Sequence, residues 1–252
     1  MERITSRKNP LLMKIRKLSS GSARARREAG EYLGDGVKLL EEALKWGAPL
    51  ETVVYSEGLD GPELPPEVRT VRVPEDVMAS ISPMESPQGA LFLCRMWDTA
   101  PPPRLEGGRY LVLDGLQDPG NVGTIWRTAD ALEADGLLLV HGCADPFGPK
   151  VVRATMGACF RLPVWETGPE RLAGLLERSG LALYATALRE DTEDIKTADL
   201  SRSAVVIGSE GRGVSPELLA MSQRALKIPM RERCESLNAA AAAAAVLWEM
   251  GR

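Results

Sequence analysis

The chain has 252 residues, of which 44% are hydrophobic and 26% are charged, and its formal net charge at pH 7 is −4. These values are ordinary for a soluble globular protein with one large domain or two smaller ones. The sequence holds no run of about 18 uncharged apolar residues, which excludes a transmembrane helix. His141 is the only histidine, so a zinc site with two histidines is excluded and a Ser-His-Asp triad could use no other base. We therefore expect no metal site and no membrane contact.

Positive charge is concentrated at the beginning of the chain. Residues 1–27 hold nine Lys and Arg against one acidic residue, a net charge of +8, so the rest of the chain carries −12. Such a segment attracts a polyanion such as RNA, although a solvated helical face has the same composition. The segment lacks the apolar core of a secretion signal, and the four cysteines are far apart in the sequence. We therefore expect a cytoplasmic protein with reduced thiols.

Residues 1–97 predict a small α/β unit. Apolar residues at helical spacing predict a helix over residues 5–19, and a second helix is expected from Val37 to about Trp46, with Asp35 as its cap. A third helix is expected from about Glu75. Short strands are expected at Leu50–Tyr55, Arg69–Val73 and Ala90–Met96.

Residues 98–108 form a linker, because three consecutive prolines stiffen this stretch and two glycines loosen its end. After it, residues 109–252 alternate short apolar runs with helical segments. Strands are expected at Tyr110–Leu113, Leu137–Val140, Leu181–Thr186, Ala204–Ile207 and Leu226–Ile228. Helices are expected at about residues 120–133, 149–158, 169–178, 215–221 and 236–250. This alternation predicts an α/β fold with a mostly parallel sheet that is covered on both faces.

Ligands of such sheets bind beyond the carboxyl ends of the strands, where three segments carry unusual chemistry. The first begins with the turn Asp118-Pro119-Gly120, after which a helix is expected to project Asn121 and Arg127. A helix N-terminus binds anions, and an arginine can hold a phosphate through two hydrogen bonds. A capped helix with an arginine in a surface ion pair gives the same pattern.

The second segment, residues 208–213, has three glycines in six residues and contains Glu210. Glycines let the backbone approach a ligand closely, but a flexible loop before a helix capped by Ser215 has the same composition. The third segment runs from Ile228 to Asn238 and precedes seven alanines, with Ser236 as the expected helix cap. Small side chains permit close approach by a cofactor or a second subunit, although an alanine run is also simply a good helix.

In this order, the three segments resemble the signature motifs of the SpoU-type RNA ribose 2′-O-methyltransferases of the SPOUT superfamily. The first motif matches through Asp118, Pro119, Gly120, Asn121, Gly123, Arg127, Thr128, Ala129 and Gly136. The second matches through Gly208, Glu210, Gly211 and Gly213, and the third through Ile228, Pro229, Met230, Glu235, Ser236, Leu237, Asn238 and Glu249. The resemblance covers about residues 109–250. Residues 3–96 also resemble the L30e-like substrate-binding domain that precedes the catalytic domain in many members.

The resemblance implies a trefoil knot in the C-terminal domain, S-adenosylmethionine as cofactor, and a homodimer packed through that domain. The catalytic residues that it implies are Asn121, Arg127, Glu210, Ser236 and Asn238. The residues that it implies around the cofactor are Thr186, Gly208, Ser209, Glu210, Gly213, Ile228, Met230, Ser236 and Leu237. The family account gives Arg127 the activation of the ribose hydroxyl, but a guanidinium holds its proton too tightly to act as a free base. We expect Arg127 to clamp the neighbouring phosphate and to polarise the hydroxyl instead, and we expect a structural role for His141.

The implied function is S-adenosylmethionine-dependent 2′-O-methylation of a ribose in structured RNA. Phosphate contacts are expected from Lys14, Arg16, Lys17, Arg24, Arg26, Arg27, Arg127, Lys150 and Arg153. The additional N-terminal domain favours 23S rRNA as the substrate, by analogy alone. Transfer RNA is an alternative substrate, and a non-enzymatic RNA-binding protein that keeps the fold is an alternative function. A nucleotide-binding enzyme acting on a small molecule and a base methyltransferase agree less well with the motifs.

Overall fold

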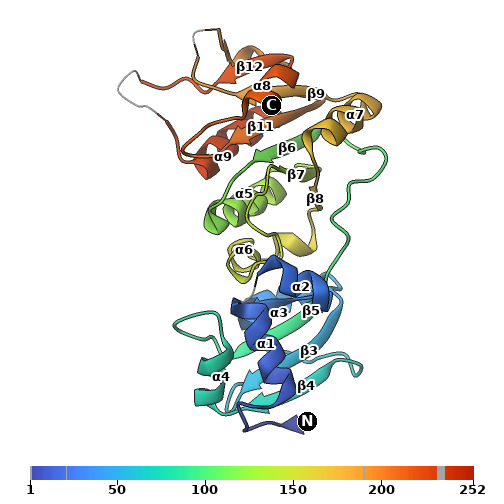
Figure 1. The fold of residues 1–252 in the computed structure, drawn as a ribbon, viewed down its shortest axis with the longest axis vertical. Helices are drawn as coiled ribbons and strands as arrows, with labels where there is room; N and C mark the ends of the chain where they lie inside the picture. The colour runs from blue at the N-terminus through green and yellow to red at the C-terminus, as the bar shows by residue number, and fades with distance from the viewer. Residues whose placement is uncertain (1, 21, 190, 232–235) are drawn as a thin grey trace. The chain divides into compact units, whose positions relative to one another are not determined.

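The computed structural model describes residues 2–20, 22–189, 191–231 and 236–252 (Figure 1). Glu235, which belongs to the third motif, lies outside the described residues. The chain divides into two compact units. The N-terminal unit contains the residues up to Trp97 together with Asp145–Phe160, and the C-terminal unit contains Asp98–Ala144 and the residues from Arg161 onward.

The N-terminal unit is built on a five-stranded mixed sheet with the order β1-β4-β3-β5-β2. Its strands are β1 Glu2–Arg3, β2 Glu31–Asp35, β3 Leu50–Ser56, β4 Arg69–Val73 and β5 Ala90–Arg95. Its helices are α1 Pro10–Ser20, α2 Ala23–Ala29, α3 Val37–Lys45 and α4 Glu75–Ile81. The helix expected at the start of the chain is confirmed as α1, which buries Leu12, Ile15 and Leu18 in the core of the unit. The described residues of the basic segment are therefore part of a folded unit.

Strand β2 is not predicted by the sequence pattern, because Gly34 and Asp35 favour a turn. In the structure Gly34 lies opposite Phe92 of β5, and a Cβ atom at Gly34 would lie 2.1 Å from the Phe92 ring. The ring therefore occupies the space of a side chain, which explains why a glycine suits this strand. Asp35 ends β2 and accepts a hydrogen bond from Ser82 Oγ at 2.8 Å, so the expectation that Asp35 caps α3 is wrong.

The segment Asp145–Phe160 packs within the N-terminal unit, although its neighbours in sequence belong to the other unit. It contains α6, Pro149–Ala154, and a short 3-10 helix, η1, at Ala158–Phe160. Its Phe147 ring is buried, with its centroid 5.4 Å from that of Tyr32 and 4.3 Å from that of Trp97. Arg26 is only 5% exposed and forms a salt bridge of 2.6 Å with Asp145. The alternating pattern places this segment in the second domain, because packing against a distant part of the chain has no local sequence signal.

The C-terminal unit contains a seven-stranded sheet with the order β10-β12-β9-β11-β6-β7-β8. Its strands are β6 Arg109–Asp114, β7 Gly136–Val140, β8 Val164–Glu166, β9 Ala182–Thr186, β10 Glu193–Asp194, β11 Ser203–Gly208 and β12 Arg224–Lys227. Its helices are α5 Pro119–Ala131, α7 Pro169–Ser179, α8 Pro216–Met221 and α9 Ala239–Met250, with a 3-10 helix, η2, at Ile195–Thr197. All described strand pairs of this sheet are parallel, which confirms the predicted sheet type. The edge strands β8 and β10 are too short to be predicted from periodicity.

Helices cover both faces of this sheet. Val112 of β6 is buried in one cluster with Leu172 of α7 and Leu218 of α8. The neighbouring Leu111 points to the opposite face and is fully buried as well, on the side where α5 and α9 lie side by side (Figure 1). Burial on both faces explains why the strands read as continuous apolar runs. No helix among the described residues is long and apolar enough to cross a membrane. The trefoil knot stays a prediction.

Candidate active site

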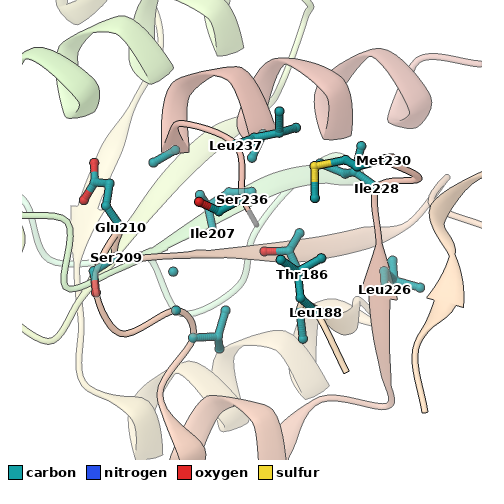
Figure 2. Close-up of a pocket in the computed structure, with 16 residues that line it drawn as sticks. Thr186, Leu188, Ile207, Ser209, Glu210, Leu226, Ile228, Met230, Ser236 and Leu237 are labelled. Carbon is teal, nitrogen blue, oxygen red and sulfur yellow. The ribbon is translucent and has the colours of Figure 1, made fainter. Parts of the chain in front are cut away.

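A pocket of about 280 Å³ lies at the carboxyl edge of the C-terminal sheet (Figure 2). Thr186 ends β9, Gly208 ends β11 and Ala239 begins α9, and all three residues line the pocket. Every residue expected around the cofactor lines it, namely Thr186, Gly208, Ser209, Glu210, Gly213, Ile228, Met230, Ser236 and Leu237. The structure therefore brings the second and third motifs together around one space, whereas contact of these residues with a cofactor stays a prediction.

The loop that follows β11 folds back on itself beside the pocket. Ser209 and Gly213 exchange two backbone hydrogen bonds, with N···O distances of 3.1 and 2.8 Å. Gly213 has a φ of +68°, and a Cβ atom at Gly208 would lie 2.1 Å from the carbonyl carbon of Gly213. This tight loop therefore needs both glycines, and it holds Glu210 at one end of the pocket, away from Leu226 and Met230 (Figure 2).

Side chains from all three motifs form a hydrogen-bonded cluster next to the pocket. Asn121 of α5 donates through Nδ2 to Oε1 of Glu210. Asn238 donates through Nδ2 to Oδ1 of Asn121 at 3.1 Å. None of the three side chains is buried, so a substrate can reach amide and carboxylate groups whose positions are already fixed. Such groups can orient a hydroxyl by hydrogen bonding.

Helix caps fix two members of this cluster. Asp118 caps α5 by accepting a hydrogen bond from the backbone N–H of Asn121 at 2.7 Å. Asn238 caps α9 by accepting a hydrogen bond from the backbone N–H of Ala240 at 2.9 Å. The expectation that Ser236 caps this helix is therefore wrong, because Asn238 fills that role and Ser236 lines the pocket instead.

Arg127 is exposed on α5. It forms no hydrogen bond or ion pair with any residue that the structure describes, so the structure does not bring it into the Asn121 cluster. An exposed guanidinium of this kind is available to hold a phosphate through two parallel hydrogen bonds.

The chemistry of the pocket suits S-adenosylmethionine, which carries a flat aromatic base, hydroxyl groups and a positively charged sulfur. Glu210 is the one charged side chain among the described lining residues, so a cationic ligand meets a negative group and no positive one. Ile207 and Leu226 provide apolar surface, and Thr186 and Ser236 provide hydroxyls. A mostly apolar pocket with a few polar groups is the usual form of a small-molecule site. The described residues contain no cluster of three or more side chains that could hold a metal ion.

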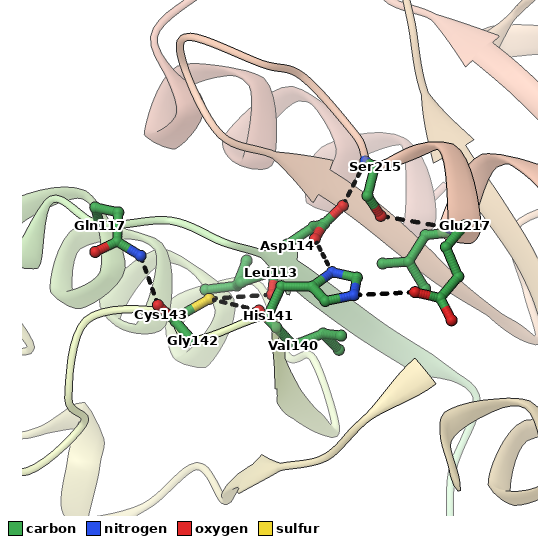
Figure 3. A network of polar contacts seen from close by, with 10 residues as sticks. Leu113, Asp114, Gln117, Val140, His141, Gly142, Cys143, Ser215 and Glu217 are labelled. Carbon is green, nitrogen blue, oxygen red and sulfur yellow. Dashed lines mark hydrogen bonds and ion pairs between the residues drawn. The ribbon is translucent and has the colours of Figure 1, made fainter. Parts of the chain in front are cut away.

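A second polar network lies where β6 and β7 end, and periodicity does not predict it (Figure 3). Asp114 Oδ1 lies 2.6 Å from His141 Nδ1, and Glu217 Oε2 lies 3.2 Å from His141 Nε2. The hydrogen bond with Asp114 is the largest cause that raises the pKa of His141 above its ordinary value, and the hydrogen bond with Glu217 adds to it. The sequence does mark Asp114 as a candidate site residue, because this carboxylate directly follows an apolar strand. It gives no such mark for Glu217, which lies beside His141 only in the folded chain.

Ser215 and Cys143, the hydroxyl and thiol drawn beside His141 in Figure 3, both have other hydrogen-bond partners. The Ser215 hydroxyl accepts a hydrogen bond from the backbone N–H of Leu218 at 3.4 Å, and Nε2 of His141 faces Glu217 instead of a serine. Burial raises the pKa of the Cys143 thiol to about 11, which keeps it protonated at neutral pH. The residues around His141 therefore do not form a Ser-His-Asp triad.

The cations expected to bind RNA have different environments in the N-terminal unit. Arg26 is wrongly predicted as a phosphate ligand, because it is buried and paired with Asp145. Lys17 and Lys150 are exposed, and Arg153 is half-buried. Lys14 forms an ion pair with Glu31, Arg16 donates a hydrogen bond to Ser80 Oγ, and Arg24 pairs with Glu28, all within this unit. Arg27 is engaged in a contact as well. Their contact with RNA stays a prediction.

Comparison with known proteins identifies the family. The model described as the SpoU rRNA Methylase family matches residues 108–248, and the model described as the MRM3-like substrate binding domain matches residues 9–91. The chain is similar to the 23S rRNA (guanosine(2553)-2′-O)-methyltransferase RlmP of Bacillus subtilis, with 32% identity over 99% of this chain and 99% of that protein. It is also similar to the tRNA (guanosine(18)-2′-O)-methyltransferase of Thermus thermophilus, with 35% identity over 56% of this chain and 73% of that protein.

A solved structure agrees with the sequence comparison over both units. The AdoMet-bound rRNA methyltransferase from Sinorhizobium meliloti matches with a TM-score of 0.86 and 30% identity, over 99% of this chain and 97% of that one. The family model alone covers more than half of the sequence, and its three motifs meet at the pocket and the Asn121 cluster. The chain belongs to the SpoU rRNA methylase family.

Proposed function

We propose that this protein transfers the methyl group of S-adenosylmethionine to a ribose 2′-hydroxyl of structured RNA. The observation that carries the proposal is that Glu210 belongs both to the pocket and to the cluster with Asn121 and Asn238. A cofactor site and a set of groups able to orient a hydroxyl are therefore contiguous. The bound cofactor supplies an electrophilic methyl group on a positively charged sulfur. The residues of the chain supply alignment, which contributes much of the rate of such a transfer.

The polar residues divide this work between them. Asn121 is held from two sides, because it donates to Glu210 and accepts from Asn238. Its position is therefore fixed before a ribose arrives, which lowers the cost of aligning the 2′-hydroxyl. Arg127 clamps the neighbouring phosphate and polarises the hydroxyl, since a guanidinium keeps its charge and matches a phosphate with two donors.

Ribosomal RNA is the favoured substrate class. The 23S rRNA methyltransferase RlmP matches this chain from end to end, whereas the tRNA methyltransferase of Thermus thermophilus matches 56% of it. The substrate-binding domain that precedes the methylase domain, matched over residues 9–91, supports the same choice. Transfer RNA is therefore the second candidate.

A homodimer is part of the proposal. Trp248 of α9 is 65% exposed, which is unusual for so large an apolar side chain. It lies on a helix that begins with seven alanines, whose small side chains allow another helix to approach closely. Tryptophan is one of the residues enriched at protein interfaces, which supports a contact through this helix.

The test incubates the full chain with S-adenosylmethionine labelled in the methyl group and with purified 23S rRNA, 16S rRNA or transfer RNA. We expect label on 23S rRNA at a position that resists alkaline cleavage, because a 2′-O-methyl group removes the internal nucleophile of the next phosphodiester. Label at an alkali-sensitive position would identify a base methyltransferase and contradict the proposal. A chain that binds RNA but no S-adenosylmethionine in a calorimetric titration would be a non-enzymatic RNA-binding protein.

A further inference from the structure

The only histidine of the chain lies between two carboxylates, outside the pocket and outside the Asn121 cluster (Figure 3). His141 Nδ1 is 2.6 Å from Asp114 of β6, and Nε2 is 3.2 Å from Glu217 in the first turn of α8. These are the charged groups that face the imidazole among the described residues. The ring can donate to both carboxylates only when both nitrogens carry a proton, so the geometry fits the imidazolium form.

Asp114 connects this arrangement to the pocket. It ends β6 and lies opposite Gly208, the last residue of β11. Its second oxygen, Oδ2, accepts a hydrogen bond from the backbone N–H of Ser215 at 2.6 Å. Ser215 directly follows Val214, which is buried and lines the pocket. Strand β11 therefore fixes one end of the loop that carries Glu210, and Asp114 fixes the other end.

The backbone at His141 is also unusual. His141 has a φ of +54°, in the left-handed region that residues with a side chain seldom adopt. Such strain persists only where surrounding contacts hold it, and it concentrates at functional sites. The side-chain hydrogen bonds of His141 to the part of the chain that the structure describes are those with Asp114 and Glu217.

We infer that His141 is a positioning residue: its charged imidazole joins Asp114 to the first turn of α8 and so holds the Glu210 loop in the shape that binds the cofactor. The inference rests on the proposed function and extends it to a residue outside the pocket. It makes the affinity of the pocket depend on the protonation of one side chain.

Loss of one proton from His141 has a definite consequence. The remaining N–H of the imidazole stays on Nδ1 and donates to Asp114, because loss of a donor costs more at this buried carboxylate than at the exposed carboxylate of Glu217. Nε2 then presents a lone pair to the Glu217 carboxylate, and the contact becomes repulsive. The first turn of α8 then loses its contact with His141, and the residues that follow the Glu210 loop are held less firmly. Cofactor binding should therefore favour the charged form, and the charged form should favour cofactor binding to the same degree.

The experiment uses the fact that one histidine gives one set of imidazole signals in a proton NMR spectrum. The pKa of His141 is measured in the full chain with and without S-adenosylhomocysteine, the reaction product, which lacks the sulfonium charge and so adds no direct repulsion. We expect the ligand to raise that pKa. If the ligand raises the pKa by about one unit, its Kd should be about tenfold higher at a pH above both pKa values of His141 than at a pH below both of them. Calorimetry measures that Kd independently of RNA and of turnover.

Two matched variants separate this role from general stability. Glu217→Gln removes the charge that faces Nε2, and Glu170→Gln is its control, because Glu170 follows a proline at the same position of α7, is exposed and lies outside the network. We expect Glu217→Gln and His141→Gln to flatten the pH dependence of Kd, and Glu170→Gln to retain it. If S-adenosylhomocysteine binds but leaves the pKa of His141 unchanged, the inference is overturned and the proposed function stands. The same holds if the Kd of Glu217→Gln keeps the native pH dependence. Absence of binding at every pH would overturn the proposed function together with it.

Discussion

Asn238 donates a hydrogen bond of 3.1 Å to Asn121 across 117 positions of the sequence. Asn121 in turn donates to Glu210, so one amide side chain connects residues from all three motifs. Each partner sits in a rigid local structure, since Asn121 lies in the first turn of α5 and Asn238 caps α9. The cluster therefore fixes the relative positions of two helix ends and one loop beside the pocket.

Replacing Asn121 with alanine removes both hydrogen bonds of this cluster. We expect Asn121→Ala to lower the rate of methyl transfer about 10- to 100-fold, because a misplaced group of this kind costs about that much in rate. Cofactor Kd should change less, since Asn121 does not line the pocket. Single-turnover kinetics and calorimetry measure the two quantities. Thr124→Ala, one turn along α5 and exposed, is the control and should leave both near the native values.

Gly208 and Gly211 lie in the same loop but have opposite tolerance for a side chain. A Cβ atom at Gly208 would lie 2.1 Å from the carbonyl carbon of Gly213, whereas a Cβ atom at Gly211 would have no other atom within 4 Å among the described residues. We expect Gly208→Ala to weaken cofactor binding by about 10- to 100-fold, because the backbone of the loop must shift. Gly211→Ala should bind normally. Equal affinities of the two variants, measured by calorimetry, would contradict the geometry of the loop.

Arg127 is expected to act on the RNA and not on the cofactor. We expect Arg127→Ala to lower turnover about 100-fold or more while cofactor Kd stays nearly constant, because the lost contact stabilises developing charge during the reaction. Arg127→Lys should recover only part of the rate, since an ammonium lacks the planar fork of two donors. The measurement compares kcat with cofactor Kd for all three proteins. Equal losses in both quantities would contradict the role of phosphate clamp.

The salt dependence of RNA binding tests the basic face of α1. Replacing both Lys14 and Lys17 with glutamine should reduce the slope of log K against log salt by about 1.4–1.8 if each lysine contacts one phosphate. The double variant Lys45→Gln/Lys196→Gln loses the same charge at other exposed positions and should retain the native slope. Filter binding of labelled rRNA fragments over a series of salt concentrations gives the slopes. An unchanged slope in the Lys14 and Lys17 variant would remove α1 from the RNA surface.

Arg26 is expected to stabilise the protein instead of binding RNA. Its guanidinium pairs with Asp145 at 2.6 Å and donates to the carbonyl oxygen of Leu18 at 3.0 Å. We expect Arg26→Ala to lower the free energy of unfolding by about 2–4 kcal/mol, because the largely buried carboxylate of Asp145 loses its charged partner and keeps the hydrogen bond from the backbone N–H of Phe147. Arg24→Ala removes an exposed i,i+4 pair with Glu28 and should cost only about 0.3–0.5 kcal/mol. Denaturant unfolding of the two variants measures the difference.

The parts of this molecule that the sequence predicts are those with a local period or a contiguous motif. Alternating apolar runs and helices predict the parallel sheet, and the three motifs identify residues such as Gly208 and Met230 that line one pocket. The family resemblance contributes the choice of chemistry. Periodicity alone does not distinguish a cofactor-binding loop, such as residues 208–213, from an ordinary turn.

The parts that the sequence does not predict depend on distant partners. Nothing local distinguishes Ser236 from Asn238 as the cap of α9, because both residue types cap helices well. The environment of His141 depends on Glu217, which is 76 positions away and meets it only after the sheet has formed. Gly34 suits a strand only because Phe92 covers it. In each case a long-range contact overrides the local preference.

The chain passes between its two units three times, after Trp97, after Ala144 and after Phe160. A truncation that begins at Asp98 would therefore not yield an independent catalytic module. It would carry Phe147, Val151 and Val152, all buried in the intact protein, without the surface that covers them. Exchange of the N-terminal unit between relatives must transplant residues 145–160 as well, so this enzyme is not modular at its apparent domain boundary.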